Sequence, residues 1–338
     1  MPDVHAAYND ALVRSQNAQL LLNLVRMRYR DTPYFVDVTS VTNQQSFAGT
    51  LGFGTDLGIH PDTATSTLHP GVSGSFSVTP TVVYTPLQGE AFVRRMVTPL
   101  SLYTVLSIST AGWNANRVFR LVVDRVNDIR NAPSAAGPTP AIAPAYRDFL
   151  ALAEAIRTLQ QAGALEVAPV RVNDAESCVF VVRSDDHDEK IAEATKTLQR
   201  LLKIAPQGSY TIVPFTGTTE PNQVHLRMRS VLSALYYLSA SVDAPPEHEK
   251  LGLVTVTKNP DGTRFDWNDV FHKLFHVRTS PSNPTLAFTK TYYRGHWFYI
   301  ADDDLDTKST FQLMAHLVSM QAGAPAMTAP LLTIPAGR

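Results

Sequence analysis

The chain has 338 residues, of which 44% are hydrophobic and 17% are charged, and its formal net charge is -1. This length and hydrophobic content are sufficient for a sizeable core, so the sequence predicts a folded protein of one or two domains. The charged fraction lies below the roughly 25% that is usual in soluble domains, which indicates a segment depleted in charge. A net charge near zero gives no electrostatic argument for phosphate binding, and we expect no nucleic-acid partner.

The cysteine content and the apolar runs exclude further classes of protein. The single cysteine, Cys178, excludes an internal disulfide and a cysteine-based zinc cluster, and its apolar run 178–182 predicts a buried strand. No stretch approaches the ~20 apolar residues that a membrane-spanning helix needs. The chain as given opens with Met1, Pro2 and Asp3 directly into polar sequence, so we expect no targeting signal at its start.

Residues 1–131 are predicted to form an N-terminal helical region into which a β-hairpin (41–88) is inserted. Asp3 is the expected N-cap of the first helix, and Pro33 closes that segment. Asn114 is the expected N-cap of a later helix, whose apolar residues recur on one face as far as Ile129. The predicted helices cover residues 4–29, 90–97, a segment that starts at Thr98 and Pro99, and 114–129, with a short strand at 34–41.

The rest of the chain is predicted to combine helices with antiparallel strands. Residues 132–144 are rich in Pro, Ala and Gly, and they form the expected connection between an N-terminal region (1–131) and a C-terminal α+β domain (145–338). The fold class expected for the whole chain is α+β, with helices packed on antiparallel sheet. The predicted helices cover residues 146–163, 188–203, 224–240 and a segment capped by Asp306 that runs to Met320, and the predicted strands cover 167–172, 177–182, 210–215, 253–258, 286–293 and 296–300.

The segment from residue 41 to residue 88 is predicted to be a long β-hairpin that is almost free of charge. It contains no Lys or Arg, and its acids are Asp56 and Asp62. Apolar and small polar residues alternate along both arms, with residues 60–70 as a polar tip. The predicted membrane or assembly face contains Phe47, Leu51, Phe53, Leu57, Ile59, Val72, Phe76, Val78, Val82 and Tyr84. The predicted lumen face contains Thr50, Gly52, Gly54, Asp56, Ser73, Ser75 and Ser77.

Three interpretations of this hairpin stay open at the level of sequence. Each arm exceeds the roughly 9–11 residues that cross a bilayer as a tilted strand, and the alternation is that of a membrane barrel. One hairpin cannot close a barrel, so this interpretation requires hairpins from many identical chains. Alternatively, the apolar face packs on helices of its own chain, or it forms an interface in a soluble assembly.

The residue types that carry catalysis or metal binding are not arranged in a recognisable motif. His272 and His276 have the spacing of metal ligands on a helix, but no Glu completes a HExxH pattern. The acidic runs 185–189 and 302–304 are explained by helix capping and by polar turns. No GxSxG, CxxC or Walker pattern is present. We therefore expect no catalytic residues, no metal, no cofactor and no enzymatic activity.

Five blocks stand out in the sequence, namely NAQLLLNLVRMRY (17–29), DTPYF (31–35), YTPLQGE (84–90) followed by Phe92, NAPS (131–134) and YRGHWFYI (293–300). These blocks resemble a poorly characterised group of proteobacterial envelope proteins. The resemblance spans most of the chain and implies a Gram-negative envelope location, in the periplasm or the outer membrane, without an activity or catalytic residues. Members of that group typically begin with a lipoprotein signal and a cysteine for lipidation, which this sequence does not show at its start.

Together these observations favour an oligomeric, envelope-associated structural protein. Its hairpin is expected to contribute to a multi-subunit barrel or pore in the outer membrane. The expected partners are further copies of the chain, outer-membrane lipid and other envelope proteins. The alternative is a soluble structural or adaptor module that uses the hairpin as a protein–protein interface.

Overall fold

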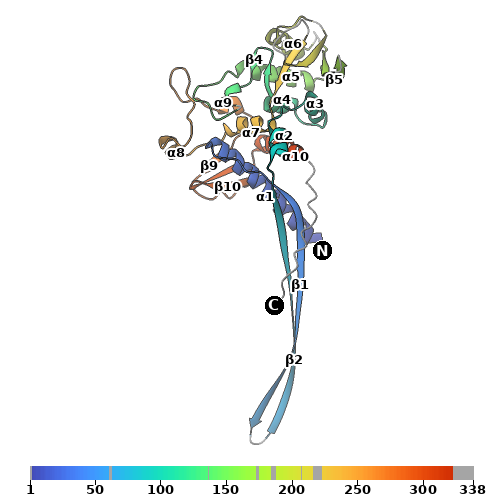
Figure 1. The fold of residues 1–338 in the computed structure, drawn as a ribbon, viewed down its shortest axis with the longest axis vertical. Coiled ribbons are helices and arrows are strands. Elements are labelled where there is room, and N and C mark those ends of the chain that lie inside the picture. Colours follow the sequence, from blue (N-terminus) through green and yellow to red (C-terminus); the bar gives the residue numbers. More distant parts are fainter. Residues whose placement is uncertain are drawn as a thin grey trace. The chain divides into compact units, whose positions relative to one another are not determined.

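The computed structural model describes residues 2–60, 63–135, 137–172, 175–183, 188–206, 208–215 and 223–322. The chain divides into two units, which are described separately (Figure 1). The body comprises residues 1–35 and 88–324, and the hairpin lies in residues 36–87. Helices and largely antiparallel sheets are combined in the described residues, which confirms the prediction of an α+β fold.

The body contains helices of widely different length around two sheets. Its helices are α1 (Pro2–Arg28), α2 (Glu90–Val97), α3 (Leu102–Thr110), α4 (Ala115–Val122), α5 (Arg147–Gln161), α6 (Glu189–Leu202), α7 (Val231–Ser239), α8 (Pro246–Lys250), α9 (Asn268–Phe271) and α10 (Leu305–Ala322), with a 3-10 turn at Pro133–Ala135. Its strands are β3 (Val123–Val126), β4 (Ile129–Arg130), β5 (Leu165–Val172), β6 (Ala175–Val182), β7 (Ser209–Pro214), β8 (Gln223–Met228), β9 (Arg278–Ser280), β10 (Ala287–Tyr293) and β11 (His296–Ala301).

The two sheets of the body differ in strand direction. The six-stranded sheet has the order β4-β3-β8-β7-β6-β5, and its β7–β8 pair is parallel while its other pairs are antiparallel. The three-stranded sheet has the order β10-β11-β9 and is antiparallel. Arg294 and Gly295 join β10 to β11 with φ values of 46° and 86°, as a two-residue hairpin turn requires. The predicted turn at these two residues is confirmed.

Side-chain caps explain where several helices begin. Asn114 accepts a hydrogen bond from the backbone N–H of Asn116 at the start of α4, as predicted. Asp188 accepts from the N–H groups of Lys190 and Ile191 at the start of α6. Other caps differ from the prediction. Ser101 caps α3 in place of Thr98, and Asp304 accepts from the N–H of Thr307 near the start of α10, so the expected cap at Asp306 is wrong.

Two predicted helices are wrong over part of their length because strand pairing competes with helical periodicity. The helix expected at 114–129 ends at Val122, and the following apolar residues form β3 and β4 around Asn127, whose φ is 46°. The helix expected at 224–240 begins only after Ser230, which caps α7. Residues 223–228 instead form β8, which pairs with β3 and β7.

The Pro- and Ala-rich segment 132–144, for which the sequence predicts a connection between two domains, belongs to the body. Its backbone is tied to neighbouring segments, because the N–H of Ala132 donates to the carbonyl of Ala145 and the N–H of Ala143 donates to the carbonyl of Lys258. In return, the N–H of Lys258 donates to the carbonyl of Ala141. The strand predicted at 253–258 is wrong, because only Lys258 of this segment forms an isolated β-bridge. The division in the structure separates the hairpin from the body.

The hairpin consists of β1 (Val36–His60) and β2 (Thr63–Pro86), which pair antiparallel from Val36–Pro86 to His60–Thr63, with one shift of register between Val38 and Ser40 (Figure 1). The short strand expected at 34–41 is therefore the beginning of β1. The pairing continues as far as His60 opposite Thr63, so the polar tip expected at 60–70 is wrong for residues 63–70. Residues 61 and 62 lie outside the described residues. The composition of residues 60–70 does not locate the turn, because a polar strand face and a polar turn have similar compositions.

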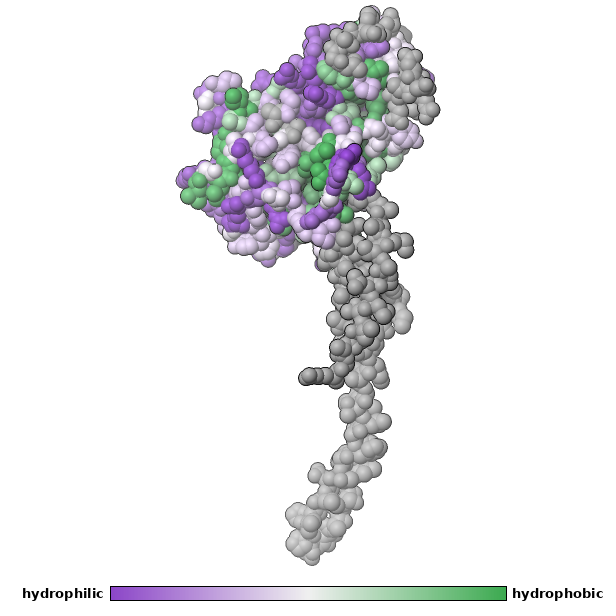
Figure 2. Space-filling view, in the orientation of Figure 1, coloured by the Kyte–Doolittle hydropathy of each residue, from purple (hydrophilic) through white to green (hydrophobic). Residues whose placement is uncertain are grey.

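The core of the body is apolar, with fully buried aromatic residues such as Phe149, Phe298 and Phe311. On the face of the body shown in Figure 2, hydrophobic residues form separate patches among hydrophilic ones. Among the described residues, we find no helix with both the length and the hydrophobicity needed to cross a membrane.

Candidate functional site

The hairpin is the candidate functional site that the sequence predicted, and its most unusual property is its length. Its strands contain 25 and 24 residues, whereas strands of globular proteins usually contain about 3–10 residues. At about 3.4 Å per residue, each arm extends roughly 80 Å. Among the described strands, β1 and β2 pair only with each other. Within that part of the chain, the outer edge of each arm presents N–H and C=O groups for pairing.

The register of the hairpin aligns the two predicted faces across the strands. Residues directly opposite each other in an antiparallel pair share one face of the sheet. A slip of one residue would place apolar residues of one arm opposite polar residues of the other. Apolar positions oppose apolar positions in the pairs Phe47–Phe76, Leu51–Val72, Phe53–Pro70 and Val41–Val82, whereas Val78 lies opposite Gln45, Leu68 opposite Thr55 and Leu57 opposite Ser66. Small or polar positions oppose one another in the pairs Ser46–Ser77, Ala48–Ser75, Thr50–Ser73, Gly52–Gly71, Gly54–His69 and Asp56–Thr67.

The structure describes the backbone of residues 36–60 and 63–86 of the hairpin. The backbone register is compatible with the alternating sequence pattern from Phe47 to Ile59 on β1. Which face meets lipid and which meets an aqueous lumen stays a prediction.

A polar cluster in the body brings together three sequence blocks that lie far apart in the chain. At the end of α1, the Tyr29 hydroxyl lies 2.6 Å from Nδ1 of His248 on α8. Tyr293 and Arg294, at the β10–β11 turn, both donate hydrogen bonds to Asp31. Beside them, Nε2 of His296 lies 2.8 Å from a carboxylate oxygen of Glu247. The blocks 17–29, 31–35 and 293–300 therefore meet at one place, through α8, which the sequence had not indicated.

Burial and hydrogen bonding shift the pKa values of three groups in this cluster. Tyr29 and His248 are 5% and 6% exposed. Burial raises the pKa of Tyr29 to about 12. Burial and the nearby His296 lower the pKa of His248, so the imidazole is neutral at pH 7. Burial alone would raise the pKa of Asp31, but hydrogen bonds from Tyr293 and Arg294 outweigh it and lower that pKa. Neutral Tyr29 and His248 thus form a hydrogen-bonded pair that links the end of α1 to α8.

Acidification should weaken the body through His248. Its pKa lies below the ordinary 6.5 in the folded state, so the unfolded chain binds the proton first as the pH falls. The stabilisation by neutral His248 is therefore complete above pH 6.5 and is lost as the pH falls toward the folded-state pKa. Tyr29, Glu247, Arg294 and His296 are the titratable or charged groups that act on it.

Urea unfolding at pH 7.5, 6.5 and 5.5, followed by tryptophan fluorescence, measures this effect, since all three tryptophans lie in the body. We expect the difference in the free energy of unfolding between the parent and His248→Gln to shrink as the pH falls. A difference that stays constant across this range would show that His248 does not titrate as its burial implies.

The two candidate metal ligands, His272 and His276, are not arranged as a metal-binding pair. Helix α9 ends at Phe271, so His272 and His276 do not share a helix. Nε2 of His276 lies 2.9 Å from Oδ2 of Asp243. In the described part of the chain, no group of three or more His, Cys, Asp or Glu side chains is arranged to hold a metal ion. Asp185, Asp186 and His187 lie outside the described residues. Cys178 is buried in β6, as predicted.

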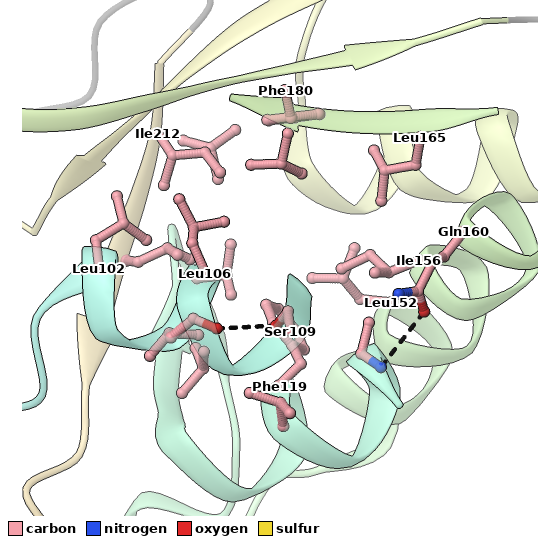
Figure 3. Close-up of a pocket in the computed structure, with 18 of the residues that line it drawn as sticks. Leu102, Leu106, Ser109, Phe119, Leu152, Ile156, Gln160, Leu165, Phe180 and Ile212 are labelled. Atoms are coloured by element: carbon pink, nitrogen blue, oxygen red, sulfur yellow. Dashed lines mark hydrogen bonds between the residues drawn. The ribbon is translucent and has the colours of Figure 1, made fainter. Parts of the chain in front are cut away.

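Figure 3 shows a further feature of the body, an apolar cavity of about 280 Å³ between helices α3–α6 and the six-stranded sheet. Ser109 and Gln160 carry the polar side-chain atoms of its lining, and the other lining side chains are apolar. The hydroxyl of Ser109 donates to the carbonyl of Val105 at 2.9 Å. Oε1 of Gln160 accepts a hydrogen bond from the backbone N–H of Ala115 at 3.3 Å. Sequence periodicity cannot reveal this cavity, because its lining has the same composition as a filled core.

Comparison with known proteins does not assign the chain to a family. No family model, no curated protein and no solved structure shows a significant match to it.

Proposed function

We propose that the protein is an oligomeric, envelope-associated structural protein whose hairpins combine into a multi-subunit barrel or pore in the outer membrane. The observation that supports this proposal most strongly is the register of β1 and β2, which aligns small polar with small polar positions on one face and, from Phe47–Phe76 to Phe53–Pro70, mainly apolar with apolar positions on the other. An amphipathic ribbon of this kind is the repeating unit of a membrane barrel. The sequence resemblance to envelope proteins supports the location.

Association is expected because β1 and β2 pair with no other strand among the described residues. A two-stranded ribbon is marginally stable by itself in water. Pairing β2 of one copy with β1 of the next would satisfy the edge groups of both, and repetition of this contact around an axis closes a ring. The absence of Lys and Arg from residues 41–88 removes the charges that natural edge strands use against such pairing.

The length of the arms is the observation that favours an alternative function. Arms of 25 and 24 residues exceed the roughly 9–11 residues that a bilayer requires. A soluble structural or adaptor module could use this whole length as a protein–protein interface. The proposal and its alternative differ in whether detergent is needed to keep the assembly in solution.

Paired proline substitutions test whether the outer edges of the arms are used. Neighbouring residues in a strand direct their N–H groups to opposite sides, so one of Ala48 and Gly49 donates toward β2 and the other toward the outer edge. Both residues are small, so Ala48→Pro and Gly49→Pro introduce the same ring with little loss of side-chain volume. We expect both variants to reduce the yield of oligomer in size-exclusion chromatography, because a proline removes a ladder hydrogen bond in either direction.

If assembly does not use the outer edge of β1, only the proline that removes a β1–β2 hydrogen bond should reduce the oligomer yield. That result would count against assembly through the strand edges. Equal oligomer yield from both variants and the parent would count against any role of this part of the hairpin in assembly.

A further inference from the structure

The cavity beside α3 is larger than the voids that close packing leaves in protein cores. Protein interiors contain few voids that exceed the volume of one water molecule. The cavity has a volume of about 280 Å³ and is lined by residues from α3, α4, α5 and α6 and from five strands of the six-stranded sheet. Such a space within the body is expected to hold a molecule other than the chain itself.

The lining of the cavity defines the chemical class of that molecule. Both polar side chains of the lining already take part in hydrogen bonds to the backbone, through the Ser109 hydroxyl and through Oε1 of Gln160. Water entering the cavity would therefore find few partners, and a cavity of this kind stays dry or binds an apolar molecule. The inner part of the ligand must accordingly be a hydrocarbon.

The residues that line the cavity differ in exposure. Leu152, Phe180 and Leu198 are buried, whereas Val167 is 37% exposed and Gln160 is also exposed. The exposed lining residues mark where the cavity meets solvent. A polar end group can stay there while the hydrocarbon occupies the interior. In Figure 3, Leu102 and Leu106 of α3 lie on one side of the space and Ile156 and Leu165 on the other.

We propose that the body binds one unbranched alkyl chain in this cavity, with the polar end of the chain in solvent. An apolar cavity of 150 Å³ accommodates benzene, so about 280 Å³ corresponds to a chain of roughly ten carbons. The proposal rests on the body alone and does not depend on how the hairpin assembles.

Two serines of α3 provide a matched pair for the test. Ser109 lines the cavity, whereas Ser107 is exposed, and each hydroxyl donates at 2.9 Å to the carbonyl four residues earlier. Ser109→Leu fills the cavity, and Ser107→Leu makes the same chemical change on the outside of the helix. Titration calorimetry of the full chain with decanoate, below its micellar concentration, should show one site per chain. We expect Ser109→Leu to weaken binding roughly tenfold or more and Ser107→Leu to leave it within about twofold.

A second variant reduces the volume of the cavity from a different element, so the result does not depend on the folding of Ser109→Leu alone. Val167→Trp adds volume at an exposed lining residue of β5, and we expect it to weaken decanoate binding as well. Decanol should bind as decanoate does, since the lining offers the end group no buried charge. No binding of decanoate to the parent, or equal binding by the parent, Ser109→Leu and Val167→Trp, would overturn the proposal. Equal loss of binding in Ser107→Leu would show that the alkyl chain binds on the surface.

Discussion

Phe53→Lys and Phe76→Lys are each expected to abolish assembly, whereas Ser75→Lys is expected to be tolerated. The register places position 76 opposite Phe47 and position 75 opposite Ala48, so positions 75 and 76 belong to opposite faces of the hairpin. A lysine on the lipid side near the bilayer midplane costs about 2–4 kcal/mol, and this cost applies to every chain in a ring. A lysine on the lumen side remains hydrated. Oligomer yield in detergent distinguishes the variants.

Conductance in planar bilayers then tests the lumen side. Ser75→Lys adds positive charge to the predicted lumen, so we expect an altered ion selectivity with preserved assembly. Equal tolerance of lysine at positions 75 and 76 would contradict lipid exposure of the apolar face. Failure of Phe76→Lys to assemble, in a parent that needs no detergent and conducts no ions, would favour the soluble interface.

Arg229→Met is expected to cost the body about 3–5 kcal/mol of unfolding free energy, because it leaves buried acceptors without their donor. Arg229 is 1% exposed, and its Nη1 donates to the carbonyls of Arg120, Leu121 and Val123 at 3.1–3.3 Å. Its guanidinium carbon lies 3.9 Å from the ring centroid of Tyr237. Burial lowers the pKa of Arg229, and these contacts compensate for its desolvation. Methionine retains the apolar volume and removes the donors.

Arg227→Met is the matched control, because Arg227 lies two residues earlier, at the end of β8, and is exposed. We expect this variant to change the free energy of unfolding by less than about 0.5 kcal/mol. Urea unfolding followed by tryptophan fluorescence measures both variants. A small effect of Arg229→Met, similar to that of Arg227→Met, would show that water or rearranged side chains satisfy the carbonyls that Arg229 contacts.

Local sequence signals predict those helix starts and turns that depend on a capping side chain or on a glycine with positive φ. Asn114 and Asp188 are caps that need no tertiary information, and Arg294-Gly295 defines a tight turn by its own conformational preference. The fold class follows from the same alternation of helical and strand segments. The depletion of charge between residues 41 and 88 likewise marked the hairpin, although the turn could not be placed.

Long-range pairing accounts for the elements that were predicted incorrectly. Residues 123–126 and 223–228 have apolar positions that also suit a helix, and their strand conformation depends on pairing between segments about 100 residues apart. Arg229 and Asn131 satisfy the carbonyls where α4 gives way to β3. A single arginine or asparagine in a sequence does not reveal such a partner.

The candidate sites in the body depend even more strongly on tertiary structure. His248 and Tyr29 form a hydrogen bond although 219 positions separate them, and no sequence motif predicts this pair. The apolar cavity is a property of how well α3 fills the space beside the sheet. The composition of α3 alone does not determine that fit.

The mass of the native particle of the intact chain, measured with and without mild detergent, tests the central proposal most directly. If hairpins from several copies form one membrane barrel, a single species should be found in detergent, with a protein mass that is a whole multiple of 37.1 kDa, and it should aggregate when detergent is removed. A monomer under both conditions at micromolar concentration would contradict the proposal.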